Sequence, residues 1–358
     1  MTQRTVFITD DFDLPETMDA ISERLAAQGI NVIRGPKTIK GQKLVYPAER
    51  LNELFGRADV AVFSSRSICS KEVIMAAPRL RGIVAPTIGT ETIDVKTASE
   101  LGIIVGNGAI PENYISVAES TVLLMLMLLY DPNRTAAILR ENRPKPGESQ
   151  HWAKMMRGRT IGFVGFGRIA RNVAQRLQGW DVNLIAYDIK PPAEMPFGVK
   201  LVDLDTLYRT SDIVGLFVVV NDETRGMISE RALSLMKPDA YLVNTARGAL
   251  VDEAALVRAL ENRQIAGAAL DTFQSEPLPA DSPLRRFDNV FLTPHMIGHT
   301  QDVYAIRPGN PYPDATCFSD TAVGNILSIL NGEPPKYCVN PDVIPLFKER
   351  CSRLDASL

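Results

Sequence analysis

The chain has 358 residues, with 39 Lys and Arg against 42 Asp and Glu, so its formal net charge is −3. That length suits about two domains, and the charge balance excludes a polybasic nucleic-acid coat or membrane anchor. A composition of 45% hydrophobic and 23% charged residues excludes a disordered chain.

Targeting and membrane signals are weak. The start, MTQRTVFITDD, has no apolar signal core. The longest apolar run, Val122 to Tyr130, lies between Glu119 and Asp131 and is shorter than the roughly 20 residues of a membrane span. The four cysteines have no CxxC spacing, which favours reduced thiols over a metal site. We therefore expect a cytoplasmic protein without metal, membrane or nucleic-acid partners.

The first third alternates short apolar runs with helical stretches. Strands are predicted at residues 6–11, 30–33, 58–65 and 82–87, with helices at 15–28 and 48–55. This βαβ rhythm predicts a parallel sheet. A long helix near 117–129 follows, and the latter part of 131–158, with its prolines and charges, is typical of a surface linker.

A second unit opens at residue 159. Six further strands are predicted, at 161–164, 182–188, 212–220, 241–245, 265–271 and 290–294. With helices between them they predict a doubly wound sheet. After His295 a proline-containing loop at 301–320 and a helix near 321–330 lead to an irregular tail, which is expected to pack on the first unit.

A cofactor motif follows the first strand of this second unit. Gly165 to Ala170 spell G-x-G-x-x-A between a strand and a helix. Gly165 permits the tight turn, and Gly167 lets the backbone approach a pyrophosphate at the helix N-terminus. Asp188 ends the next strand, 21 residues after Gly167, where a carboxylate binds the ribose and repels a 2′-phosphate. The pattern favours NAD over NADP, although the positive charge of the nearby Lys190 would weaken that preference.

Three polar residues fall where later strands of the same sheet end: Arg247, Glu276 and His295. Hydride transfer to a 2-keto acid needs a fixed cation for the carboxylate, which Arg supplies through two bonds. It also needs a proton donor that titrates near neutrality, which His provides, and a carboxylate beside the His stabilises the imidazolium. Each residue alone has an ordinary interpretation as a surface or turn residue; three strand-end positions in one dinucleotide domain favour catalysis.

These segments carry a family signature. VGFGRIAR, VNTARGALVDEAAL, GAALDTFQSEPLP and LTPHMIGHT resemble the D-isomer-specific 2-hydroxyacid dehydrogenase family, over nearly the whole chain. The resemblance implies an α/β protein of two domains. A Rossmann-type NAD-binding domain would span 123–299, and a discontinuous, flavodoxin-like substrate domain would span 1–122 and 300–358, with a cleft that closes on the substrate. It also implies a homodimer.

The resemblance also implies roles for single residues. Arg247 would bind substrate, Glu276 would orient the histidine, and His295 would be the acid/base. The expected cofactor-binding residues are Gly165, Gly167, Arg168, Ile169, Asp188, Thr245 and Asp271. The expected substrate-binding residues are Arg66, Ser67, Thr87, Ile88 and Gly89, where Thr87 and Ile88 replace part of the family's glycine-rich loop.

The predicted function is an NAD(H)-dependent oxidoreductase that interconverts a D-2-hydroxy acid and its 2-keto acid. One alternative is an NAD(H)-sensing corepressor of the same fold, which the Arg-Glu-His set does not exclude. Formate dehydrogenase ranks low, because that enzyme typically has Gln at the position of Glu276.

Overall fold

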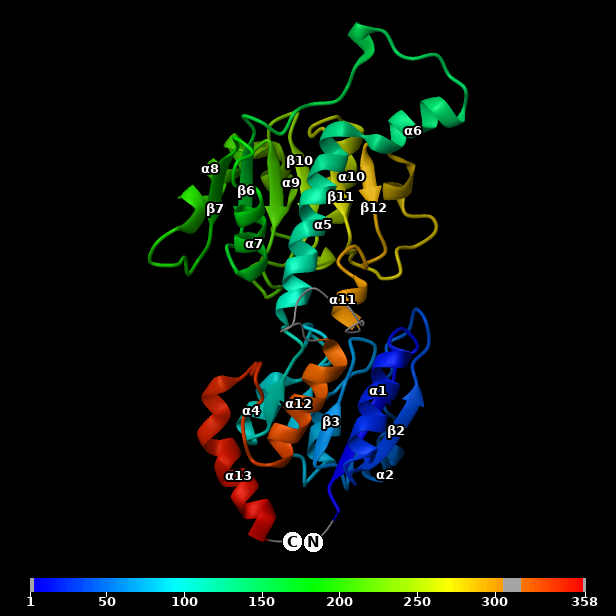
Figure 1. The fold of residues 1–358 in the computed structure, drawn as a ribbon, viewed down its shortest axis with the longest axis vertical. Helices are drawn as coiled ribbons and strands as arrows, with labels where there is room; N and C mark the ends of the chain where they lie inside the picture. Colours follow the sequence, from blue (N-terminus) through cyan, green and yellow to red (C-terminus); the bar gives the residue numbers. More distant parts are fainter. Residues whose placement is uncertain (1–2, 305–316, 357–358) are drawn as a thin grey trace. The chain divides into compact units, whose positions relative to one another are not determined.

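The computed structural model describes residues 3–304 and 317–356, which belong to two compact units (Figure 1). Unit 1 is Met1–Glu112 with Gln301–Leu358, and unit 2 is Asn113–Thr300. The boundary predicted between residues 122 and 123 falls inside helix α5 (Pro111–Tyr130), nearly all of which belongs to unit 2. A helix that runs across a boundary leaves no loop or composition change by which the sequence could mark it.

Unit 1 contains a parallel sheet of five strands in the order β2-β1-β3-β4-β5. The strands are β1 (Thr5–Asp10), β2 (Asn31–Lys37), β3 (Val60–Val62), β4 (Gly82–Val84) and β5 (Ile104–Gly106). This is the flavodoxin-like order, so the predicted fold class of this part is confirmed. The prediction had no strand at β5.

Alternate residues of the strands face two helical layers. Val6, Ile8 and Val62 pack against α1 and the C-terminal helices, while Phe7 and Phe63 pack against the layer of α2, α3 and α4. Both faces are covered, which explains why the strands read as continuous apolar runs. The helices are α1 (Pro15–Ala26), α2 (Leu51–Phe55), α3 (Lys71–Met75), α4 (Val95–Glu100), α11 (Gln301–Tyr304), α12 (Phe318–Leu330) and α13 (Ile344–Ala356).

The C-terminal helix α13 is tied to unit 1 by charged side chains. Arg350 donates to the carbonyl oxygens of Leu80 (2.6 Å), Leu101 (3.2 Å) and Pro78 (3.0 Å). Asp355 accepts from the buried Arg81 (3.2 Å) and from Arg4 (2.6 Å). A buried guanidinium needs such a partner, because its charge would otherwise be uncompensated.

We expect Asp355→Asn to flatten the acid dependence of stability. The hydrogen bond from Arg81, with that from Arg4 and the charges of both, lowers the pKa of Asp355 to about 2. A lowered carboxylate pKa stabilises the fold above the unfolded pKa of about 4, and this contribution disappears as the pH falls toward 2. Thermal midpoints measured between pH 5 and pH 3 should fall less steeply in the variant. The exposed Asp342→Asn, as control, should behave like the parent; equal slopes in all three proteins would contradict the role of Asp355.

Unit 2 contains a parallel sheet of seven strands in the order β12-β11-β10-β9-β6-β7-β8. The strands are β6 (Thr160–Val164), β7 (Asn183–Tyr187), β8 (Lys200–Leu201), β9 (Ile213–Leu216), β10 (Tyr241–Asn244), β11 (Gly267–Leu270) and β12 (Val290–Leu292). Counted from β6, the first six follow the Rossmann order 3-2-1-4-5-6 with one strand added. The predicted doubly wound sheet is confirmed, and the two-residue strand β8 was not predicted.

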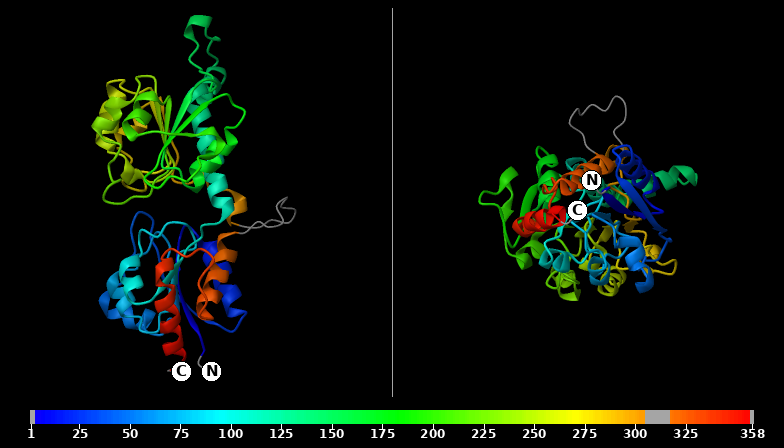
Figure 2. Two further views of the ribbon diagram at one scale, coloured as in Figure 1. Left: turned by 90° about the vertical axis from the view of Figure 1, so that its left-hand side faces the viewer. Right: turned by 90° about the horizontal axis from the view of Figure 1, so that it is seen from below.

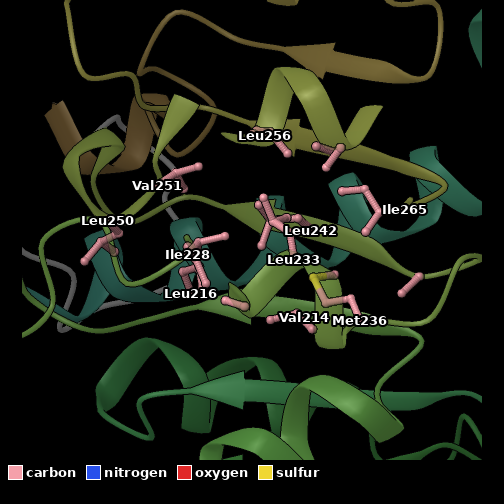
Figure 3. Packing of buried hydrophobic residues seen from close by; sticks show 14 of the residues in the cluster. Val214, Leu216, Ile228, Leu233, Met236, Leu242, Leu250, Val251, Leu256 and Ile265 are labelled. Carbon is pink, nitrogen blue, oxygen red and sulfur yellow. The ribbon is translucent and has the colours of Figure 1, made fainter. Parts of the chain in front are cut away.

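Helices cover both faces of this sheet. On one face Val214, Leu216 and Leu242 pack against helices that contribute Leu233 and Leu256 (Figure 3). The opposite face, with Phe163 at its centre, packs against α5 and α7. The remaining helices of unit 2 are α6 (Pro132–Arg140), α7 (Arg168–Arg176), α8 (Leu204–Thr210), α9 (Glu230–Leu235) and α10 (Glu253–Glu261).

One helix in the described part of the chain, α5, is long and apolar enough to cross a membrane by length and composition. The expectation of no span rested on the apolar run from Val122 to Tyr130, whereas the helix itself begins earlier, at Pro111. Half of its apolar window is buried, and Leu124, Met125 and Leu129 pack in the core beside Phe163. Such packing is typical of a core helix in a globular domain.

Candidate active site

The glycine turn between β6 and α7 combines a tight turn with open space. Gly165 has a φ of 89°, in the left-handed region that favours glycine. A Cβ there would lie 2.7 Å from the Val218 side chain, so the turn packs directly on that segment. At Gly167 a Cβ would meet nothing within 4 Å, and no side chain caps the helix that begins at Arg168. The first amides of α7 can therefore receive an anion.

Asp188, after β7, holds this turn in place. Its Oδ2 accepts from the amide of Phe166 and its Oδ1 from the amide of Lys190, each at 2.7 Å. An ionised carboxylate has about four acceptor positions, so two remain for the hydroxyl groups of a ribose. Thr245, at the end of β10, shares a hydrogen bond with Thr121 (3.0 Å).

The loop that carries Arg247 follows β10 and lies against the loop that follows β11. Asn244 shapes it, because its Nδ2 donates to the carbonyl oxygen of Arg247 (2.9 Å) and its Oδ1 accepts from the amide of Ala246 (3.1 Å). A Cβ on Gly248 would lie 1.9 Å from the carbonyl carbon of Phe273. Only glycine lets these two backbones approach so closely, and this contact brings Arg247 beside the loop of Glu276.

Glu276 and His295 form a hydrogen-bonded pair. His295 Nδ1 lies 2.8 Å from Glu276 Oε2, and the amide of Phe273 donates to the other carboxylate oxygen (3.1 Å). Burial acts to raise the pKa of Glu276, but the hydrogen bond and charge of His295, the Phe273 amide and the charge of Arg247 together lower it. The carboxylate is therefore ionised at neutral pH, and the pair leaves His295 Nε2 for another partner.

Asp271 anchors the segment that bears His295. Its Oδ1 accepts from the Thr293 hydroxyl (2.7 Å) and from the amides of Met296 (3.0 Å) and Ile297 (3.2 Å). His295 itself has a φ of 54°, a backbone conformation that costs energy for a residue with a side chain and needs such support. Burial raises the pKa of Asp271, against those hydrogen bonds and the charge of His295.

The structure thus brings together the three residues predicted for catalysis, because β10, β11 and β12 are neighbours in the sheet and their parallel carboxyl ends share one edge. Sequence reasoning missed the supporting residues Asn244 and Gly248 and the anchoring role of Asp271. The Gly after Arg247 was a usable signal, since a glycine beside a functional residue often marks close backbone approach.

In unit 1, the predicted substrate loop Thr87–Gly89 follows β4. Two of its carbonyl oxygens already accept hydrogen bonds: the amide of Gly108 donates to Thr87 O (2.9 Å), and Asn107 Nδ2 donates to Ile88 O (2.8 Å). The amides of Ile88 and Gly89 make no hydrogen bond within the described part of the chain. They can therefore donate to an anionic ligand.

The predicted pair Arg66 and Ser67 lies in the loop after β3. Ser67 is fully buried, and its hydroxyl bonds to Thr9 (3.1 Å) and Ser64 O (3.4 Å). Ser67 therefore joins the strand ends, and its contact with substrate stays a prediction. Arg66 donates to the carboxylate of Asp13 and to the Ser65 hydroxyl (3.2 Å).

Comparison with known proteins identifies the family. Residues 122–297 match the model described as D-isomer specific 2-hydroxyacid dehydrogenase, NAD binding domain. A glyoxylate reductase of Thermofilum pendens is 38% identical over 76% of this chain and 78% of its own length. The chain belongs to the D-isomer-specific 2-hydroxyacid dehydrogenase family. The resemblance predicted from the sequence is confirmed, and the chain is an oxidoreductase with a nicotinamide-cofactor domain.

Other proteins similar to this chain carry names that refer to different substrates. D-3-phosphoglycerate dehydrogenase of Methanocaldococcus jannaschii is 39% identical over 84% of this chain but only 55% of its own length. The solved structure of an acyclic imino acid reductase in complex with NADPH and D-Arg has a TM-score of 0.77 at 25% identity, and covers 94% of this chain and 100% of the other. Family membership alone therefore specifies neither the substrate nor the choice between NAD and NADP.

Proposed function

We propose that the protein interconverts a D-2-hydroxy acid and its 2-keto acid by hydride transfer with NAD(H). The observation that carries the proposal is the His295–Glu276 pair, 2.8 Å apart, with the charge of Arg247 acting on the same carboxylate. An acid/base pair and a fixed guanidinium at the carboxyl edge of a dinucleotide-binding sheet are what reduction of a small keto acid requires.

In this proposal each of the three residues has one role. His295 donates a proton from Nε2 to the carbonyl oxygen during reduction and accepts it during oxidation. Glu276 is a positioning residue, which orients the ring through Nδ1 and stabilises the imidazolium. Arg247 binds the carboxylate through two parallel hydrogen bonds and polarises the ketone. In unit 1, the amides of Ile88 and Gly89 are donors for an anionic group.

The nicotinamide cofactor, when bound, supplies or accepts the hydride. The open space at Gly167 and the uncapped α7 N-terminus fit a pyrophosphate. Gly165, Gly167, Arg168 and Ile169 would hold that group. Asp188 would bind the ribose, and Thr245 and Asp271 would contact the nicotinamide end. Asp271 Oδ2 has no hydrogen-bond partner in the described residues, so it can accept from a carboxamide.

We expect Asp188→Ala to relax the preference for NADH, because the carboxylate repels the 2′-phosphate of NADPH. The ratio of kcat/KM with NADPH to that with NADH should rise about tenfold or more, which corresponds to the loss of one close like-charge contact. Asp188→Asn is the matched variant, since it removes the charge and keeps an acceptor oxygen for one of the two backbone amides, Phe166 or Lys190. An unchanged ratio in both variants would refute this role.

The proposal is tested by NADH oxidation with glyoxylate, hydroxypyruvate, pyruvate and phenylpyruvate. We expect turnover with at least one of these 2-keto acids and formation of the D-hydroxy acid. Binding of NADH without turnover of any 2-keto acid would count against the proposal and would favour the corepressor alternative. We also propose a cytoplasmic homodimer, which sedimentation of the purified protein tests.

A further inference from the structure

Three loops lie side by side at the carboxyl edge of the unit 1 sheet. β3 pairs in register with β1 on one side and with β4 on the other, and neighbouring strands lie about 4.8 Å apart. The loop after β1 carries Asp13, the loop after β3 carries Arg66, and the loop after β4 carries Ile88 and Gly89. The last two loops are joined by a hydrogen bond from Thr92 Oγ1 to Ser64 O (3.2 Å).

Arg66 is the guanidinium next to the proposed anion-binding amides, and its charge is already compensated. Its Nη2 donates to the carboxylate of Asp13, its Nη1 donates to the Ser65 hydroxyl (3.2 Å), and its Cζ lies 5.6 Å from the centre of the Phe12 ring. The side chains of Arg66 and Asp13 are 32% and 48% exposed, so a ligand in solution can reach both.

Tyr304, the last residue of α11, lies near Asp13 and Arg66. Burial and then the charge of Asp13 raise the pKa of Tyr304, whereas the charge of Arg66 lowers it. The phenol and both charged groups are thus close together, and the ring of Tyr304 packs on Phe318 with centroids 5.5 Å apart. The ion pair with Arg66 holds the Asp13 carboxylate near this phenol.

We propose that Asp13 is a specificity-determining residue, which occupies Arg66 and selects 2-keto acids without a second anionic group. This inference rests on the proposed function and refines its substrate class. A substrate with a phosphate or carboxylate tail would have to displace Asp13 from Arg66 or lie beside it as a like charge, and either arrangement disfavours binding. A substrate with an uncharged tail neither displaces Asp13 nor is repelled by it.

Lys43 could give the opposite substrate preference, because it is a second positive charge near Arg66. Lys43 belongs to the segment after β2, and its Nζ donates to the carbonyl oxygen of Ser65, so a second cation contacts the loop that carries Arg66. If its charge dominated, the protein would favour anionic tails in spite of Asp13. The proposal states the opposite, namely that the close contact of Asp13 with Arg66 decides the preference.

The experiment compares kcat/KM for two substrates with anionic tails, oxaloacetate and 3-phosphohydroxypyruvate, with kcat/KM for glyoxylate. In the parent protein glyoxylate should be preferred. Asp13→Asn should raise the ratio in favour of the anionic tails by about tenfold, through KM rather than kcat, because Arg66 becomes available for a charge-assisted bond. Adding Arg66→Gln to Asp13→Asn should abolish the gain.

Asp19→Asn is the matched control, because it also removes one exposed carboxylate that pairs with an arginine, Arg34, in unit 1. It should leave the ratio unchanged. An active Asp13→Asn variant with the parental ratio, or a parent that prefers anionic tails, would overturn this inference and leave the proposed function intact. Absence of turnover with every 2-keto acid would overturn the proposed function, and this inference with it.

Discussion

Replacement of His295 by alanine is expected to lower kcat for 2-keto acid reduction by about 10²–10⁴, the usual contribution of a positioned general acid. The reason is geometric. Glu276 holds Nδ1 at 2.8 Å, which fixes the ring and leaves Nε2 as the proton donor. NADH affinity, measured by fluorescence titration, should persist, because the glycine turn and Asp188 lie at other strand ends of the same sheet.

His299→Ala is the control, since it removes a second histidine from the same segment. It should retain most of the activity. If His295→Ala lost NADH binding, or if both histidine variants lost activity equally, the role of His295 in proton transfer would be misassigned.

Gly248→Ala is expected to destabilise unit 2 and to abolish most activity. A Cβ at this position would lie 1.9 Å from the backbone of Phe273, so the loops of Arg247 and Glu276 would have to separate. Overpacking of this kind typically costs about 1–3 kcal/mol or more, and a displacement of about 1 Å in a catalytic group can cost about 10²-fold in rate. The melting temperature and kcat/KM should both fall.

Gly167→Ala offers the contrasting case. A Cβ there meets no protein atom within 4 Å, so the melting temperature without cofactor should stay near that of the parent. NADH affinity should fall instead, because the methyl group would lie where the pyrophosphate approaches. A Gly248→Ala protein with parental stability and activity would show that the contact with Phe273 does not position the site.

The sequence predicted both sheets because their longer strands are continuous apolar runs separated by helices. It missed β8, because a strand of two residues is too short to show a periodicity. It also missed β5, although β3 and β4, which have the same length of three residues, were predicted. The predicted boundary, between residues 122 and 123, and the division between Glu112 and Asn113 both lie within α5, where the amino-acid pattern of a helix continues without interruption.

The shared sheet edge of Arg247, Glu276 and His295 was predictable because strand ends and residue chemistry are both visible in a sequence. The burial of Ser67 was not predictable, since the sequence does not show whether a serine hydroxyl faces a ligand or a neighbouring strand. The contact of Gly248 with Phe273 and the three hydrogen bonds to Asp271 depend on chain segments brought together only by folding. The pairing of Asp13 with Arg66 likewise depends on two segments that only folding brings together.

The most direct test of the central claim is kcat/KM for the preferred 2-keto acid in His295→Ala, in Glu276→Gln and in the double variant. If Glu276 acts only through His295, the double variant should be within about threefold of His295→Ala alone, as for residues that act as one unit. Losses that multiply in the double variant would contradict the account, because Glu276 would then act on the reaction independently of the histidine.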